Sequence, residues 1–158
     1  MGQLAEGRAA LTRAQIQGRI DLDRQTFDAL VAHAHSDAPY EVCGFLAGAA
    51  GQVSRHYEIP NAARSMTFYT MDAKAMLQAM NDMDDRGIEL IAIYHSHTHT
   101  EAFPSATDLE LAAYPDAVYL IISLQDDTPI VRGYDIVEHK VTERIVFLDG
   151  DKAPAGKR

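Results

Sequence analysis

The sequence predicts one α/β or α+β domain, in which helices pack on a mixed β-sheet. Three observations lead to this fold class. The 158 residues are enough for a single domain with short ends. Apolar residues make up 47% of the chain, which is ordinary for a globular core. Strand-like and helix-like segments alternate, and the last three strand-like segments follow one another as a meander.

The first half of the chain is interpreted as a strand, a helix and a hairpin. Asp23 or Asp21 is placed to cap a helix whose apolar residues recur at helical spacing. A Gly-Ala-Ala-Gly turn at 48–51 separates two further strand-like segments. The expected elements are an edge strand at 20–22, a helix that runs to about His35, and strands at 41–46 and 53–59.

The second half adds two helices and four strands. Asp72 is a candidate N-cap for a helix through Met83, and Gly87 would end that helix. Ser105 is the expected N-cap of a short helix, with Asp108 three residues later, close to a capping box. Four methionines are interpreted as core packing on one helix: Met71, Met76, Met80 and Met83. The expected strands are 88–94, which leads directly into His95, then 117–124, 130–137 and 141–148.

Charge and cysteine content exclude several classes of protein. Lys and Arg number 14 and Asp and Glu number 23, so the net charge of −9 argues against sequence-independent nucleic-acid binding. The single cysteine, Cys43, excludes a disulfide framework and an all-cysteine zinc site within one chain. It is interpreted as a small core residue. Seven histidines leave a site with histidine and carboxylate ligands open.

The expected domain organisation is a single domain over residues 20–149, with a flexible extension at 1–19 and a flexible tail at 150–158. No apolar run approaches the ~20 residues that span a bilayer, and the first residues lack a hydrophobic signal segment. We therefore expect a cytoplasmic protein with no membrane contact.

The segment from Ile91 to Asp108 carries the chemically informative residues. His95 and His97 are two residues apart at the end of a predicted strand, so their side chains point the same way and can share a metal ion. A catalytic zinc takes three protein ligands and a water, and Asp108 is the best local third ligand. Without further evidence, two histidines at this spacing more often belong to a solvated loop. Ser105 and Asp108 on their own more often mark the start of a helix.

A zinc hydrolase also needs a carboxylate that lies near the metal without binding it. Glu101 and Glu110 are the local candidates. Glu41 is distant in sequence, but it begins an apolar strand-like segment, where partial burial would suit a proton shuttle. The residue pattern alone leaves this choice open, as it does any role of His99.

The spacing of these residues resembles that of the JAMM (MPN-plus) metalloproteases. His95-Ser-His97, seven residues, Ser105, two residues and Asp108 match the signature H-x-H-x(7)-S-x-x-D. The segment PYEVCGFLAG at 39–48 resembles the strand with which that family supplies a glutamate ahead of a Cys-Gly pair. The likeness extends over roughly 20–148. One departure is Thr98, where the family often has proline, and it lies outside the ligand set.

The resemblance implies a role for each matching residue. His95, His97 and Asp108 would bind one Zn²⁺ per chain. Glu41 would be the general acid/base, and Ser105 would stabilise the oxyanion. The implied fold is the MPN fold, a curved mixed sheet with helices, similar in outline to zinc deaminases.

The resemblance also implies hydrolysis of peptide or isopeptide bonds after the C-terminal Gly-Gly of a ubiquitin-like or sulfur-carrier protein. The short stretches at 60–68 and 98–104 leave little room for insertions, as in compact prokaryotic members similar to sulfur-carrier-protein peptidases. The leaving group, an amino acid or a protein lysine, and the oligomeric state stay open.

Three other interpretations rank lower. A catalytically silent MPN scaffold that binds protein partners would usually lack one or more ligands, and all are present here. A zinc deaminase would use cysteine ligands. A structural zinc site would need four protein ligands, and His99 is the only obvious extra residue.

Overall fold

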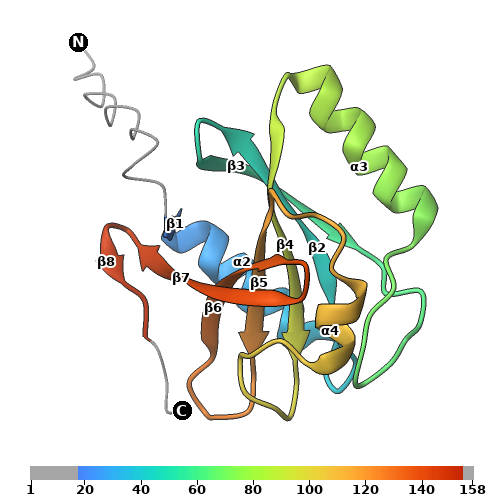
Figure 1. Ribbon diagram of the computed structural model, residues 1–158, viewed down its shortest axis with the longest axis vertical. Coiled ribbons are helices and arrows are strands. Elements are labelled where there is room, and N and C mark those ends of the chain that lie inside the picture. Colours follow the sequence, from blue (N-terminus) through green and yellow to red (C-terminus); the bar gives the residue numbers. More distant parts are fainter. Residues whose placement is uncertain (1–17, 155–158) are drawn as a thin grey trace.

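The computed structural model describes residues 18–154, so most of the expected N-terminal extension and the last four residues lie outside the described part. Its eight strands form one sheet in the order β1-β7-β6-β5-β4-β2-β3, with β8 beside β7 (Figure 1). The pairs β1–β7 and β4–β5 are parallel and the other pairs are antiparallel. The predicted mixed sheet with packed helices is confirmed.

The elements lie close to the expected segments. The strands are β1 (Arg19–Leu22), β2 (Cys43–Ala49), β3 (Gln52–Ile59), β4 (Glu89–His97), β5 (Val118–Ser123), β6 (Ile130–Val137), β7 (Lys140–Leu148) and β8 (Asp151–Lys152). The helices are α2 (Arg24–Asp37), α3 (Ala73–Arg86) and α4 (Ala106–Leu111). Among the described residues, none of these helices is both long and apolar enough to cross a membrane.

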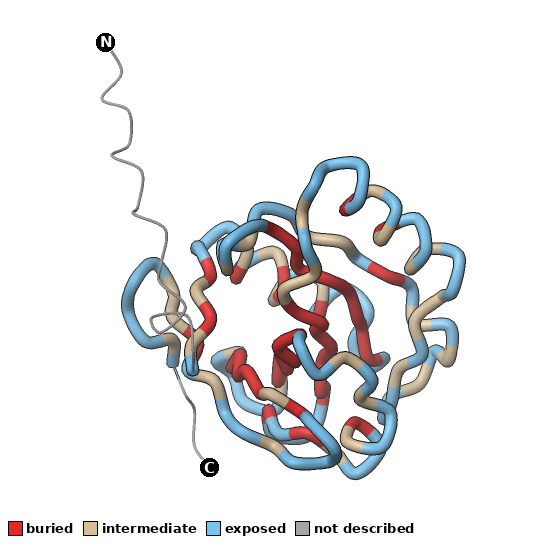
Figure 2. The backbone as a smooth tube through the Cα atoms, turned by 45° about the horizontal axis from the view of Figure 1, so that its top comes forward, coloured by how far each residue is buried: buried red, intermediate tan, exposed pale blue. Residues whose placement is uncertain are grey.

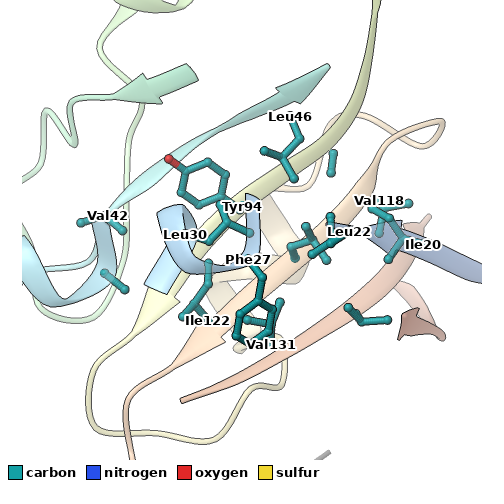
Figure 3. Packing of buried hydrophobic residues seen from close by; sticks show 14 residues of the cluster. Ile20, Leu22, Phe27, Leu30, Val42, Leu46, Tyr94, Val118, Ile122 and Val131 are labelled. Atoms are coloured by element: carbon teal, nitrogen blue, oxygen red, sulfur yellow. The ribbon is translucent and has the colours of Figure 1, made fainter. Parts of the chain in front are cut away.

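The core divides between the two faces of the sheet. On one face α2 packs through Phe27, Leu30 and Ala34 against buried residues of the central strands (Figure 3). On the other face α3 contributes Ala79 and Met83 to a second cluster. The central strand β5 is buried along its whole length, and Figure 2 shows the buried segments gathered in the interior. The sheet is therefore a rigid platform, and its strand ends can hold a site in fixed geometry.

The expected helix ends are confirmed by their caps. The Asp23 side chain accepts a hydrogen bond from the Thr26 N–H at 2.7 Å, and Asp72 accepts one from the Ala75 N–H at 2.9 Å. Gly87 follows α3 with a φ of 65°, which glycine adopts without the steric cost that other residues meet.

Several boundaries differ from those that the sequence predicted. Strand β2 begins at Cys43, so Glu41 lies just before it. Strand β4 continues through His97, because it pairs with β5 as far as Ser123. Met71 lies outside α3, although it packs against the same cluster as that helix.

The end of the domain also differs from the expected tail. Asp149 and Gly150 adopt positive φ angles of 48° and 90° and turn the chain back on itself. Asp151 and Lys152 then pair with β7 as β8. Residues 155–158 lie outside the described part of the chain.

One acidic residue of α3, Asp82, contacts side chains of β3 as well as of its own helix. Its carboxylate accepts hydrogen bonds from the Tyr57 hydroxyl at 2.6 Å, Arg86 at 2.9 Å and Arg55 at 3.0 Å. This group ties α3 to β3.

Candidate metal centre and active site

The register of β2 and β4 places three predicted site residues on one face of the sheet. Cys43 of β2 lies opposite His95 of β4. Val42 and Ser96 continue the pairing, since the Ser96 N–H donates to the Val42 carbonyl at 3.1 Å. Because side chains alternate between faces along a strand, His95, His97 and Glu41 share one face. Glu41, His95 and His97 each offer one potential ligand atom, and these three atoms lie within 4.8 Å of one another.

Asp108 reaches the same place from α4. Its Oδ2 lies 3.0 Å from His95 Nε2 and 3.1 Å from His97 Nε2, and the two Nε2 atoms are 3.1 Å apart. All three side chains are buried. Figure 1 shows α4 beside the carboxyl end of β4. The sequence predicted these three side chains as metal ligands, and in the structure their ligand atoms lie next to one another.

The donor set fits a zinc ion. Ligands about 2.0–2.1 Å from a tetrahedral zinc lie about 3.3 Å from one another, close to the spacing of these three atoms. The Nδ1 of His97 lies 2.8 Å from the Glu101 carbonyl oxygen. Since a carbonyl can only accept, Nδ1 carries the proton there and Nε2 is the nitrogen that faces Asp108. This type of outer hydrogen bond orients metal-binding histidines.

The charges of the three groups depend on one another. Burial lowers the pKa of His95. Burial also opposes the protonation of His97, but hydrogen bonds to Asp108 and to the Glu101 carbonyl outweigh it and raise the His97 pKa. Burial disfavours the Asp108 carboxylate as well, yet its hydrogen bonds with both histidines hold the Asp108 pKa well below its usual range. Asp108 is therefore an anion at neutral pH, as a ligand to a dication should be.

Glu41 has a different environment from Asp108. It is 3% exposed, and burial, aided by the nearby Asp108 charge, raises its pKa to about 7. Within the described residues, the buried side-chain polar atoms without a hydrogen-bond partner are Glu41 Oε1 and His95 Nδ1. Buried polar groups are normally paired, so an orphaned carboxylate oxygen here indicates a place for a ligand or water. A carboxyl group that titrates near neutral pH suits proton transfer.

The backbone around Glu41 is held by a loop that the sequence analysis did not assign to the site. The Glu41 N–H donates to the Ser65 carbonyl at 2.9 Å, and the Asn61 side chain donates to the Glu41 carbonyl at 3.0 Å. Ser96 Oγ accepts from the Val42 N–H at 2.9 Å. Asn61 follows a proline at the start of the loop, but its partner lies 20 residues away, so no local signal identifies its role.

The other residues considered for the site differ in burial and in their contacts. Ser105 caps α4, and its Oγ accepts a hydrogen bond from the Asp108 N–H at 3.1 Å. Glu101 and Glu110, the local alternatives to Glu41, are exposed. His99 is also exposed, and its Nδ1 lies 2.8 Å from the Thr98 hydroxyl. Tyr69, which the sequence analysis did not single out, stacks on His95 with ring centroids 4.7 Å apart.

Comparison with known proteins shows the family. Residues 23–136 match the prokaryotic homologs of the JAB domain. The chain belongs to the prokaryotic JAB/MPN family. This confirms the resemblance inferred from the signature, and it confirms the predicted fold. The match contains Glu41, His95, His97, Ser105 and Asp108.

Individual proteins that are similar to this JAB domain support the same family assignment. The CysO-cysteine peptidase of Mycobacterium tuberculosis is 46% identical over 122 residues, which are 75% of this chain and 84% of the relative. The desampylase of Haloferax volcanii is 35% identical over 112 residues, 66% of this chain and 81% of the relative. The solution structure of a protein from Desulfitobacterium hafniense superposes with a TM-score of 0.75 at 34% identity, over 84% of this chain and 94% of that one. The JAB domain described here is thus a hydrolase of peptide or isopeptide bonds.

Proposed function

We propose that the chain is a zinc-dependent peptidase that hydrolyses the bond after the C-terminal Gly-Gly of a ubiquitin-like or sulfur-carrier protein. The observation that carries the zinc part is the convergence of His95 Nε2, His97 Nε2 and Asp108 Oδ2 at 3.0–3.1 Å. The substrate class is supported by the names of the two relatives, a CysO-cysteine peptidase and a desampylase.

In this proposal His95, His97 and Asp108 hold one Zn²⁺. When bound, the ion supplies Lewis acidity, which brings the pKa of a water toward ~7 and stabilises negative charge on the scissile carbonyl. The anionic Asp108 offsets part of the positive charge.

Glu41 moves the proton. Its carboxylate accepts a proton from the attacking water and delivers it to the leaving nitrogen, so one residue serves as base and then as acid. Its pKa of about 7 favours both directions of transfer near neutral pH. Its N–H donates to the Ser65 carbonyl and its carbonyl accepts from the Asn61 side chain. These two hydrogen bonds fix its backbone, which keeps the carboxylate beside the histidines without making it a ligand.

Ser105 stabilises the oxyanion. Its Oγ already accepts from the Asp108 N–H, which uses a lone pair and leaves the hydroxyl proton to donate. A donor held in place before the reaction stabilises charge that develops in the transition state.

The surface around the site suits a protein substrate. Three large apolar side chains on the two neighbouring loops, Met66, Phe68 and Phe103, are 39–47% exposed. The same two loops carry Asn61, which contacts the Glu41 backbone, and Glu101, whose carbonyl contacts His97, so these apolar side chains belong to segments that border the site. An extended Gly-Gly tail would pass between these loops to reach Glu41 and Ser105.

The proposal is tested with small ubiquitin-like carriers that have one residue appended after Gly-Gly. Intact mass spectrometry should show loss of that residue. A chelator should stop the reaction and added Zn²⁺ should restore it. Carriers that end in Ala-Ala before the same residue serve as the matched control and should be cleaved far more slowly. If the zinc-loaded protein cleaves no Gly-Gly-extended carrier, the proposal is wrong, and a silent binding module becomes the better interpretation.

A further inference from the structure

One cavity of the protein has Glu41, the proposed proton carrier, among its lining residues. Its volume is about 260 Å³, below the ~300–1,000 Å³ of sites for drug-sized ligands, so it suits a single amino acid. Its walls include Glu41, Tyr40, Asn61, Arg64 and Asp37. Since Glu41 would protonate the leaving nitrogen, a cavity that it lines is placed to receive the leaving group.

Arg64 supplies the positive charge of this cavity. Its N–H donates to the Asn61 carbonyl at 3.1 Å, and its φ of 43° turns the chain at this point. The guanidinium carbon lies 5.3 Å from the centre of the Tyr40 ring, a cation–π contact that orients the side chain along one wall. Within residues 18–154, Arg64 takes part in no ion pair, so its planar donors are available to an anion.

The two classes of leaving group differ in where they carry a carboxylate. A single amino acid released from the carrier has its α-carboxylate on the carbon that bears the leaving nitrogen. A protein lysine leaves through its ε-nitrogen, and its α-carboxyl group is part of a peptide bond. An arginine beside the leaving nitrogen therefore distinguishes the two, because guanidinium binds carboxylate through two parallel hydrogen bonds.

We propose that Arg64 and the cavity beside Glu41 form a subsite for the α-carboxylate of a single C-terminal amino acid, so that the enzyme releases free amino acids in preference to protein lysines. This inference rests on the proposed function and specifies its substrate class.

The test compares two carriers that differ only at the last group. Each has the same neutral residue after Gly-Gly, with a free carboxylate in one and a carboxamide in the other. The wild-type protein should cleave the free acid about tenfold or more faster in kcat/KM, the usual effect of a charge-assisted hydrogen bond. Arg64→Ala should lose this preference through a higher KM for the acid, and Arg64→Lys should keep part of it. Arg24→Ala, an exposed arginine on α2, is the matched control and should keep the full preference.

The outcomes separate the two proposals. Equal cleavage of acid and amide by the wild-type protein would overturn the carboxylate subsite and leave the peptidase intact. A preference that persists in Arg64→Ala would show that another group binds the carboxylate. If neither carrier is cleaved, the proposed function itself fails. Thermal melts of Arg64→Ala, together with its unchanged rate on the amide, show that the variant is folded.

Discussion

Ser105 and Asp108 fix each other through two reciprocal hydrogen bonds. The Ser105 N–H donates to Asp108 Oδ2 at 2.9 Å, and the Asp108 N–H donates to Ser105 Oγ at 3.1 Å. The same Oδ2 faces the Nε2 atoms of His95 and His97. The capping box that starts α4 therefore also orients the proposed aspartate ligand, so substitutions at Ser105 combine a structural and a catalytic effect.

We expect Ser105→Ala to lower the rate of hydrolysis ~10²–10³-fold, because an oxyanion donor is lost. It should also lower the free energy of unfolding by about 1 kcal/mol through the lost cap. Zinc content should be unchanged, since Ser105 is not a ligand. Measurements of kcat/KM, chemical denaturation and metal content check the three statements.

Ser105→Gly separates the two effects, because glycine at an N-cap costs only a few tenths of a kcal/mol yet removes the hydroxyl. Its rate should fall as far as that of Ser105→Ala. A wild-type rate in the glycine variant would show that the hydroxyl acts only as a cap.

Glu41→Gln should lower turnover by ~10²–10⁴-fold, the usual contribution of a general acid/base. Zinc content should remain at one per chain, since this residue is placed as a proton carrier. Glu101→Gln is the matched control: its carbonyl, and not its carboxylate, contacts His97, so its rate should match wild type. Undiminished hydrolysis by Glu41→Gln would remove Glu41 from the mechanism.

Zn²⁺ should stabilise the metal-free protein against unfolding, because it binds the folded site. At a free concentration 100 times its Kd the gain is about 2.7 kcal/mol, and it appears as a higher unfolding midpoint. His97→Asn should abolish the shift. His99→Asn alters an exposed histidine two residues away and should retain the shift. A shift of equal size in both variants would place the zinc elsewhere.

The parts of the fold that the sequence predicted depend on local chemistry. The caps at Asp23, Asp72 and Ser105 use hydrogen bonds within three residues, so a short window contains the whole signal. The placement of His95 and His97 on one face follows from alternation along a single strand. The short strand β8 was missed because its formation depends on pairing with β7, which the local pattern does not encode.

The role of Glu41 could not be predicted from the local residue pattern alone. Its choice over Glu101 and Glu110 required the resemblance to a family, because its position depends on the pairing of Cys43 with His95, 52 residues later. Its supports, Asn61 and Ser65, belong to an irregular loop. Periodicity cannot predict which loop carbonyl receives a given N–H, since such contacts follow from the tertiary fold.

Tyr94→Phe should destabilise the fold by about 1–3 kcal/mol without changing zinc content. The Tyr94 hydroxyl lies 2.7 Å from His33 Nδ1 and 2.6 Å from His56 Nε2, and its removal leaves both nitrogens without this partner. Tyr94 packs in the cluster under α2 (Figure 3). His95 is the next residue of β4, so its side chain points to the opposite face of the sheet and the metal site is unaffected. Tyr40→Phe alters an exposed tyrosine and should stay within about 0.5 kcal/mol of wild type. Equal stability of both variants would contradict this account, and chemical denaturation measures it.

Cys43 should be unreactive in the folded protein and dispensable for catalysis. Its side chain is 0% exposed, and its Sγ donates to the Ile59 carbonyl at 3.3 Å. Burial and the nearby Glu41 charge raise the pKa of the thiol to about 12, so the reactive thiolate is scarce at pH 8. Iodoacetamide should therefore label the urea-unfolded protein rapidly and the native protein only as fast as the fold opens. Hydrolysis should continue after prolonged exposure to the reagent, and rapid native labelling accompanied by loss of activity would instead assign Cys43 a role in the site.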